Sequence, residues 1–251
     1  MIAALLPVKT FTRSKERLAG FLTPAERAAL ARTMFEDVLA ALREALSAGS
    51  PTPGVPSTFP CAGVVAGAAP VGMESIGQGL DCLLVATAEP YVLSRCRDLH
   101  IPCLEESEQR SHSDSVDLAT GWAMNLGATS LLSLPIDTPA VTGAEILALL
   151  ELHRRFPVVI VPSADGRGTN ALLRTPPDAI RPHFGPESCR LHVQEAESKG
   201  LSCLVFPSPG LGSDIDTPED LQDFALTQKP CRTVTLARQM LATNRGVPAC
   251  R

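Results

Sequence analysis

Three aspartates are the clearest candidates for chemistry in this chain. The tetrapeptide Ile-Asp-Thr-Pro occurs at residues 136–139 and again at 215–218, each time after an apolar segment and before a helix start. Asp214 and Asp216 are two residues apart, so they point to the same side of an extended chain. If they converge with Asp137, the carboxylates repel one another unless a cation lies between them, and oxygen-only ligands suit Mg²⁺. We predict a magnesium site at these three aspartates, with turn formation and helix capping as the alternative for any one of them.

A basic loop follows the first predicted strand. Lys9, Arg13, Lys15 and Arg17 place four cations within nine residues of an otherwise acidic protein. Such side chains can hold a triphosphate, and arginine can bind it through two hydrogen bonds. The segment is not a Walker A loop, because it has no Gly-x-x-x-x-Gly-Lys. A solvated basic loop is the competing interpretation of this spacing.

Two glycine-containing segments could contact anionic substrates. In Asp165–Leu173, glycines flank Arg167, and Thr169 and Asn170 lead into an apolar strand. The glycines let a ligand approach the backbone closely, while the Thr and Asn side chains can hydrogen-bond to phosphate or carboxylate oxygens. A plain glycine turn explains the same pattern equally well.

The second of these segments is Phe184–Ser188, which opens a predicted helix. Free N–H groups at a helix start attract anions, so Gly185 and Ser188 could hold an acceptor phosphate. His192 lies one turn further on. We interpret it as a packed or surface histidine and not as a catalytic one, because no Ser or Cys partner is evident.

The elements that would position these residues alternate between strand and helix. Helix-start signals lie at Thr23, Thr142 and Thr217. Strands are predicted at 2–8, 62–66, 83–86, 130–135 and 158–161, further helices near 89–98 and 115–126, and a polar loop at 104–114. This alternation predicts an α/β fold with a mostly parallel sheet and helices on both faces. Ligands of such sheets bind at the carboxyl ends of the strands, where Asp137 lies.

Bulk composition limits the classes of protein to consider. A chain of 251 residues that is 45% hydrophobic can bury a full core. The net charge of −5 argues against nucleic acid or a membrane as partner, since both select basic faces. The short apolar start is interpreted as a strand and not as a signal peptide, so a cytoplasmic location is expected. We expect one domain over 1–228 and a C-terminal appendage over 229–251, of uncertain order, with a weak helical pattern near 233–242.

Taken together, these residues resemble one family. Its N-terminal signature is similar to Leu6-Pro7-Val8-Lys9 followed by Ser14-Lys15-x-Arg17-Leu18. Three further motifs match in order: Asp165-Gly166-x-Gly168-Thr169-Asn170-Ala171-Leu172, Phe184-Gly185-x-x-Ser188-x-x-x-His192 and Asp214-Ile215-Asp216-Thr217-Pro218-x-Asp220-Leu221. The family is the 2-phospho-L-lactate guanylyltransferases of coenzyme F-420 biosynthesis, which includes members that use phosphoenolpyruvate or 3-phosphoglycerate. The resemblance covers about residues 2–225.

The resemblance implies a three-layer, Rossmann-like nucleotidyltransferase fold of the glycosyltransferase-A type, with GTP as donor and Mg²⁺ as cofactor. Carried over by position, Asp137, Asp214 and Asp216 would be the metal ligands. The nucleotide would be held by Lys9, Ser14, Lys15 and Arg17, of which the three cations would also act in catalysis. Thr169, Gly185 and Ser188 would lie at the acceptor, a small phosphorylated acid.

One position departs from the family's pattern. The family usually carries Gly-Leu-Asn-x-Ala where this chain has Ser115-Val116-Asp117-Leu118-Ala119. Asp117, in place of Asn, could still accept hydrogen bonds from guanine N–H groups, but it could also repel phosphate. This leaves open a non-catalytic nucleotide-binding relative, as well as an enzyme of the same fold with another phosphorylated acceptor. A nicotinamide dehydrogenase is disfavoured because no Gly-x-Gly-x-x-Gly follows the first strand. The choice of acid and the oligomeric state stay open.

Overall fold

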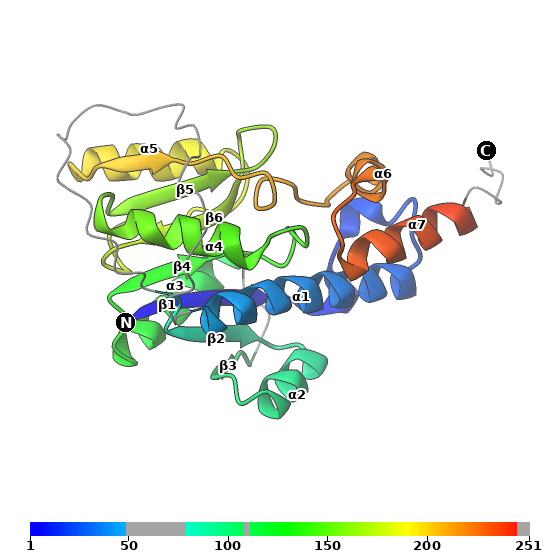
Figure 1. The fold of residues 1–251 in the computed structure, drawn as a ribbon, viewed down its shortest axis with the longest axis horizontal. Helices are drawn as coiled ribbons and strands as arrows, with labels where there is room; N and C mark the ends of the chain where they lie inside the picture. The colour runs from blue at the N-terminus through cyan, green and yellow to red at the C-terminus, as the bar shows by residue number, and fades with distance from the viewer. Residues whose placement is uncertain (49–78, 108–110, 245–251) are drawn as a thin grey trace.

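A seven-stranded sheet lies between two layers of helices in the computed structural model, which describes residues 1–48, 79–107 and 111–244 (Figure 1). The strand order is β3-β2-β1-β4-β6-β5-β7. The strands are β1 (Ile2–Val8), β2 (Cys82–Thr87), β3 (Cys103–Glu105), β4 (Ser130–Ser133), β5 (Val158–Pro162), β6 (Thr169–Arg174) and β7 (Cys203–Val205). Among these described strands β6 is antiparallel to both of its neighbours, and the other pairings are parallel. The predicted mostly parallel sheet is therefore confirmed, and the antiparallel β6 makes it a mixed one.

The helices follow the strands as the alternation predicted. They are α1 (Pro24–Ser47), α2 (Pro90–Asp98), α3 (His112–Asn125), α4 (Gly143–Leu150), α5 (Ser188–Ser198), α6 (Pro218–Leu226) and α7 (Arg232–Asn244). Short 3₁₀ turns are η1 (Phe11–Arg13), η2 (Glu16–Leu18) and η3 (Glu151–Arg154). The start signals at Thr23, Thr142 and Thr217 each form a complete capping box, which satisfies backbone N–H groups that the first turn leaves unpaired.

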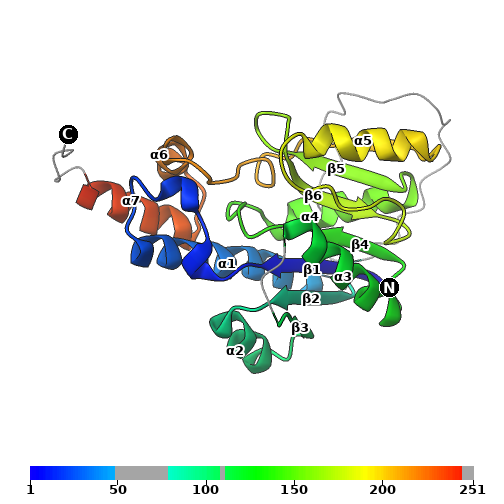
Figure 2. The ribbon, with the colours of Figure 1, turned by 180° about the vertical axis from the view of Figure 1, so that it is seen from behind.

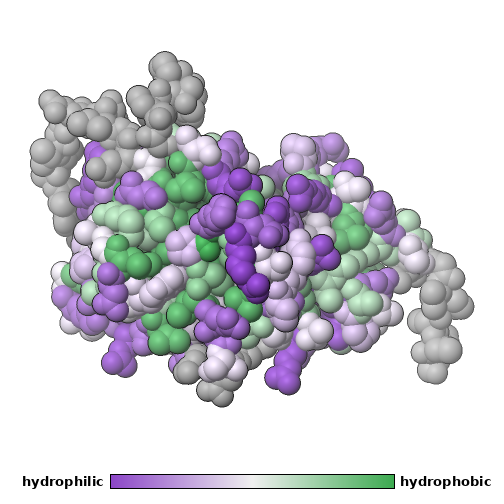
Figure 3. All heavy atoms as spheres, turned by 90° about the horizontal axis from the view of Figure 1, so that it is seen from below, coloured by the Kyte–Doolittle hydropathy of each residue, from purple (hydrophilic) through white to green (hydrophobic). Residues whose placement is uncertain are grey.

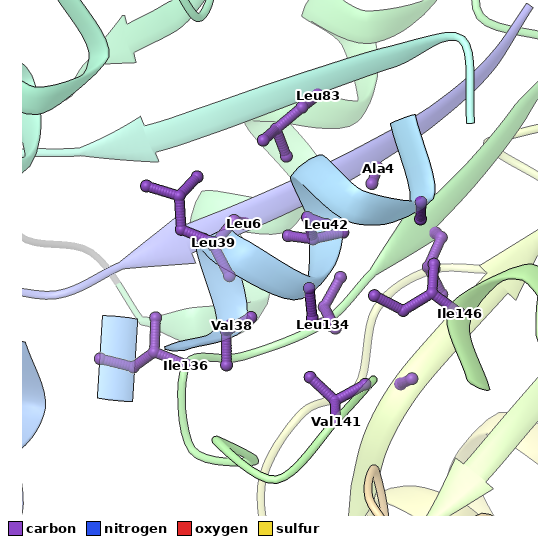
Figure 4. Close-up of a cluster of buried hydrophobic side chains, with 14 of the residues drawn as sticks. Ala4, Leu6, Val38, Leu39, Leu42, Leu83, Leu134, Ile136, Val141 and Ile146 are labelled. Carbon is purple, nitrogen blue, oxygen red and sulfur yellow. The ribbon is translucent and has the colours of Figure 1, made fainter. Parts of the chain in front are cut away.

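Strand β1 shows how the two helical layers share one sheet. All seven of its residues are buried, and alternate side chains point to opposite faces. Ala4 and Leu6 pack in the cluster beneath α1 and α4, which Figure 4 shows in close-up. Ala3 and Leu5 belong instead to the cluster beneath α3. Because it is covered on both faces, β1 is apolar along its whole length, as parallel central strands are.

Two predictions concern the chain between β1 and β4: a strand at 62–66 and a polar loop at 104–114. The strand expected at 62–66 lies outside the described residues. The polar loop expected at 104–114 is wrong at both ends, because Cys103–Glu105 forms edge strand β3 and α3 begins at His112. A three-residue edge strand carries too little hydrophobic pattern to be recognised. The helix start did have a signal, since the Ser111 hydroxyl accepts from the Asp114 N–H at 3.1 Å and caps the helix.

The C-terminal helix α7 packs against α1 and α6, at the end of α1 that extends beyond the sheet (Figures 1 and 2). Val234, Ala237 and Met240 of α7 are buried in one cluster with residues of α1 and α6. The helical pattern predicted near 233–242 is confirmed, and this segment is an ordered part of the packing. The domain boundary at residue 228 stays a prediction.

Among the described residues, no helix is both long enough and apolar enough to cross a bilayer. On the face of the molecule shown in Figure 3, hydrophilic residues are interspersed with hydrophobic ones.

The buried carboxylate of Asp37 in α1 caps the start of α7. It accepts from the Arg232 and Thr233 N–H groups at 3.2 and 2.8 Å and from the Thr233 hydroxyl at 2.7 Å. Replacing Asp37 by Ala leaves these donors unpaired and should lower the free energy of unfolding by about 2–3 kcal/mol, measured by urea titration. Asp223→Asn, on the exposed face of α6, is the matched control and should change it by less than about 0.5 kcal/mol. Equal stability of the two variants would contradict the capping role.

Candidate active site

Segments far apart in the sequence meet at one edge of the sheet. Strands β1, β4 and β7 run in the same direction, so the segments that follow them emerge on the same side. These segments carry the basic loop, Asp137, and the Asp214–Asp216 pair. Because β6 runs the opposite way, it begins at this edge, with Thr169 and Asn170. The structure thus gathers most of the predicted site residues at the carboxyl ends of the parallel strands, where open α/β sheets bind ligands.

The Lys15 ammonium group lies between two of the predicted metal ligands. Its Nζ is 2.6 Å from Asp137 Oδ1 and 3.0 Å from Asp216 Oδ1, and it donates to the Ile215 carbonyl at 2.6 Å. A lysine has three N–H donors, so these three partners use all of them. The lysine side chain is 3% exposed, against 36% and 37% for the two aspartates. Burial alone would lower the pKa of Lys15, but the two carboxylates outweigh it and raise the pKa.

The backbone around Lys15 is built to aim this side chain inward. Lys15 has φ of 56°, in the left-handed region that residues with a side chain seldom adopt. On one side, the Ser14 hydroxyl donates to the Thr10 carbonyl and the Ser14 carbonyl accepts from Arg27. On the other side, Leu18 is fully buried in the cluster of α1, α6 and α7. Backbone strain held in place by such surroundings is typical of functional sites.

The third predicted metal ligand has a different partner. Asp214 Oδ1 accepts from the Asn170 side-chain amide at 3.0 Å. Burial raises the pKa of Asp214, and the nearby charges of Asp216 and Asp137 act in the same direction. Within the residues that the structure describes, no three acidic, His or Cys side chains are arranged to hold a metal ion. The three aspartates are near one another, as predicted, since Asp137 and Asp216 share Lys15 and their charges act on Asp214. Their role as metal ligands stays a prediction.

The remaining predicted nucleotide contacts lie around this cluster. Arg17 is 73% exposed, and its Nη1 is 3.6 Å from Asp216 Oδ2. Lys9 is exposed at the end of β1 and lines a small cavity. Asp117 is exposed on α3 and is not one of the residues lining this cavity. The contact of Asp117 with the nucleotide stays a prediction.

The cavity beside Lys9 contains two polar residues that the sequence analysis missed, Glu106 and His112. They line it together with the end of β1 and with Ser115, the first residue of the motif that departs from the family's pattern. Glu106 Oε1 and His112 Nε2 are both buried, and neither has a hydrogen-bond partner among the residues that the structure describes, which is unusual for polar atoms. Burial lowers the pKa of His112 to about 4, so the ring is neutral at pH 7. No sequence signal marked these residues, because they lie in a segment that has the composition of a polar loop.

The predicted acceptor residues form a second group at the same edge. Arg167 in the loop after β5 accepts through its carbonyl from the Cys189 N–H at 3.0 Å, which ties this loop to the start of α5. Gly185 has φ of 139°, a conformation that excludes most other residues, and its carbonyl accepts from the Ser188 N–H. Thr169, Gly185 and Ser188 are thereby held on linked segments.

His192 is packed inside the protein, one of the two environments expected for it, while its lack of a catalytic role stays a prediction. It is fully buried, and its Nδ1 is 3.0 Å from Thr169 Oγ1. Its Nε2 accepts from the His183 backbone N–H at 2.7 Å. Burial, together with the charges of His183 and Arg174, lowers the pKa of His192 to about 3.

The buried His192 predicts a loss of stability in mild acid. Below pH 6.5 the unfolded chain takes up a proton at this residue, whereas the folded chain does so only near pH 3. Between these values the unfolded state binds more protons, so the free energy of unfolding falls as the pH falls, by about 1.4 kcal/mol per pH unit. Urea titrations at several pH values from 6.5 to 4.5 give the free energy of unfolding as a function of pH. In His192→Gln this free energy should change less steeply with pH than in the wild type, by this amount. Arg190→Gln, exposed on the same helix, should keep the wild-type slope, and parallel curves for all three proteins would refute the assignment.

Comparison with known proteins adds to this geometry. A protein named phosphoenolpyruvate guanylyltransferase, from Conexibacter woesei, is 34% identical over 246 residues, which is 97% of this chain and 90% of the relative. A 2-phospho-L-lactate guanylyltransferase from Methanothermobacter thermautotrophicus is 30% identical over 223 residues, 89% of this chain and 83% of the relative.

Solved structures agree with the fold. A crystal structure named as a nucleotide-diphospho-sugar transferase, from Desulfovibrio desulfuricans G20, superposes with a TM-score of 0.69 at 16% identity. The match covers 97% of this chain and 96% of that one. The family model described as "Guanylyl transferase CofC like" matches residues 2–48 and 73–242 and so includes α7. With this match over most of its length, the chain belongs to the CofC-like guanylyl transferase family.

Proposed function

We propose that this protein transfers GMP from GTP to a small phosphorylated acid and releases pyrophosphate, as a step of coenzyme F-420 biosynthesis. The observation that carries the proposal is the cluster of Lys15, Asp137 and Asp216 at the carboxyl edge of a nucleotidyltransferase fold. Two carboxylates held 2.6 and 3.0 Å from one cation form a site suited to a polyphosphate and its counter-ion. The names of the relatives support guanylyl transfer and an acid acceptor. A cytoplasmic location is part of the proposal.

The reaction is an in-line displacement. A phosphate oxygen of the acceptor attacks the α-phosphorus of GTP and forms the new P–O bond. The bond from the α-phosphorus to the bridging oxygen breaks, and its electrons leave with pyrophosphate. A phosphate monoester has its second pKa near 6 and is largely ionised at pH 7, so no general base is needed. The obstacle that the protein must overcome is the approach of one anion to another.

The exposed cations of the basic loop would reduce this repulsion. Lys9 and Arg17 are accessible beside the cavity and the aspartate cluster, so they can reach the triphosphate. Ser14 would add a hydrogen-bonding group on the same loop. Lys15 has no N–H donor left for the triphosphate while it keeps its present contacts, because all three of its donors are used within the protein. It orders Asp137 and Asp216 next to the reacting phosphates.

The carboxylate oxygens of the acidic cluster are ligands of the type that a hard divalent cation prefers, and they would have to rearrange around it. Asp137 and Asp216 already converge on one positive charge, and their exposed fractions leave oxygens open to the site. Asp214, held by Asn170, would complete an all-oxygen set of the kind that Mg²⁺ prefers. Bound there, Mg²⁺ would supply Lewis-acid stabilisation of the charge on the phosphates.

The acceptor would bind where the loop after β5 meets the start of α5. Thr169, Gly185 and Ser188 lie on segments joined by the bond between the Cys189 N–H and the Arg167 carbonyl. The guanine base would lie toward the cavity beside Lys9, where Glu106 offers a carboxylate oxygen that has no hydrogen-bond partner in the described part of the chain. Such an oxygen can accept from the N–H groups of guanine, whereas it would face the acceptor nitrogen N1 of adenine. Asp117 remains a second candidate for this contact.

The proposal predicts which substrates give pyrophosphate. GTP and Mg²⁺ should release it only when one of three acids is added: 2-phospho-L-lactate, phosphoenolpyruvate or 3-phosphoglycerate. The measurement is a coupled pyrophosphate assay with each acid separately, and ATP in place of GTP is the control for base choice. Intact binding of GTP without turnover in all three would contradict the acid acceptors and favour a different acceptor or a non-catalytic relative.

A second prediction concerns the aspartate cluster. Asp216→Asn removes a charge from the proposed cation site and should lower kcat by about 10²-fold or more. Asp223→Asn, an identical change on the exposed face of α6, should leave kcat within about twofold. Circular dichroism of both variants checks that the fold is intact. Unchanged turnover in the folded Asp216→Asn protein would remove Asp216 from the catalytic site.

A further inference from the structure

The hydrogen bonds of His192 determine which of its nitrogens carries the proton. The His183 backbone N–H donates to Nε2 at 2.7 Å. A backbone N–H can only donate, so Nε2 must be the acceptor and carry no hydrogen. A neutral imidazole has a single N–H, which in this ring is therefore on Nδ1.

This tautomer sets the role of the neighbouring threonine. Nδ1 lies 3.0 Å from Thr169 Oγ1 and is the donor of this bond, so the hydroxyl oxygen is the acceptor. A threonine hydroxyl can accept two hydrogen bonds and donate one. Because His192 offers no acceptor to it, the hydroxyl proton of Thr169 must point to another partner. Thr169 is the first residue of β6, next to Asn170, which binds Asp214.

The surroundings of His192 keep this arrangement fixed. The ring is fully buried and packs edge-on against Phe184, with the centroids 5.5 Å apart. His183 and Arg174 are the nearby groups that disfavour a positive charge on it, and Glu195 acts in the opposite direction. With burial as the largest cause, the pKa of His192 falls to about 3. The ring therefore stays neutral over the whole range in which an enzyme is assayed.

We propose that His192 is a positioning residue, whose Nδ1–H bond to Thr169 Oγ1 directs the Thr169 hydroxyl proton toward an oxyanion of the phosphorylated acid. The inference rests on the proposed function, because it takes Thr169 as an acceptor contact. The oxyanion is a phosphate or carboxylate oxygen, and His192 itself does not touch it. The Thr169 hydroxyl thus becomes a hydrogen-bond donor of fixed direction through a residue 23 positions further along the chain.

The tautomer can be tested without any substrate. A long-range ¹H–¹⁵N correlation spectrum of the full chain with labelled histidines should show a ring protonated at Nδ1 alone, unchanged from pH 5 to 9, whose signals disappear in His192→Asn. A ring protonated at Nε2, or one that titrates in this range, would overturn the inference.

Binding of phosphoenolpyruvate, measured by calorimetry, tests the effect on the acceptor. Thr169→Val keeps the shape and loses the hydroxyl, and it should weaken binding about tenfold, the effect of one hydrogen bond to a charged group. His192→Leu should weaken it by a similar factor, and the double variant should be no weaker than either single one. His192→Asn places an amide N–H near the Nδ1 position and should restore most of the affinity. The Kd for GTP should stay within about twofold in all of these variants.

The outcomes separate this inference from the proposed function. A purely structural role of His192 would lower the thermal stability, weaken GTP and the acid alike, and add to the effect of Thr169→Val; that result overturns the inference. If His192→Leu misfolds, the affinities of Thr169→Val and His192→Asn for phosphoenolpyruvate still test the positioning role of His192. A wild-type protein that binds phosphoenolpyruvate with the predicted hierarchy yet releases no pyrophosphate would refute the proposed function alone. Absence of phosphoenolpyruvate, 2-phospho-L-lactate and 3-phosphoglycerate binding would refute both.

Discussion

The ammonium group of Lys15, held between Asp137 and Asp216, is the interaction on which the rest of the site depends. Without it, two carboxylates that follow different strands would face each other and push the loops after β4 and β7 apart. The lysine comes from the loop after β1, 201 residues before Asp216. One buried cation therefore fixes three loops relative to one another. Its attraction is strong because the lysine itself is 3% exposed, although water partly screens the two aspartates, which are 36% and 37% exposed.

This arrangement needs support from outside the sheet. Leu18, just after Lys15, and Ile215, just before Asp216, are both fully buried in the cluster that α6 and α7 form on the far end of α1. The Asp37 cap in turn fixes the start of α7 to α1. By packing against Leu18 and Ile215, the C-terminal helices thus stabilise the positions of Lys15 and Asp216. A segment that reads in the sequence as an appendage is part of what holds the active-site edge in shape.

The sequence predicts the fold and the neighbourhood of the site well because both follow from local rules. The burial of β1 on two faces shows as an unbroken apolar run, and the capping boxes at Thr142 and Thr217 mark the starts of α4 and α6, the helices that follow Asp137 and Asp216. The pairings across the site depend on tertiary structure and leave no local signal. Neither the bond from Asn170 to Asp214 nor the burial of Glu106 Oε1 and His112 Nε2 beside the cavity could be inferred from residue spacing.

Lys15 shows most clearly how the structure changes a prediction. Four cations in one loop predict a triphosphate-binding segment, and charge alone gives no reason to separate Lys15 from Lys9 or Arg17. Geometry separates them, because a lysine has three donors and Lys15 uses all three on Asp137, Asp216 and the Ile215 carbonyl. If Lys15 moves to bind phosphate, another cation must bind Asp137 and Asp216 in its place, since leaving these two neighbouring carboxylates without a positive partner is costly. Any contact of Lys15 with the nucleotide is therefore coupled to the arrival of a positive charge at Asp137 and Asp216.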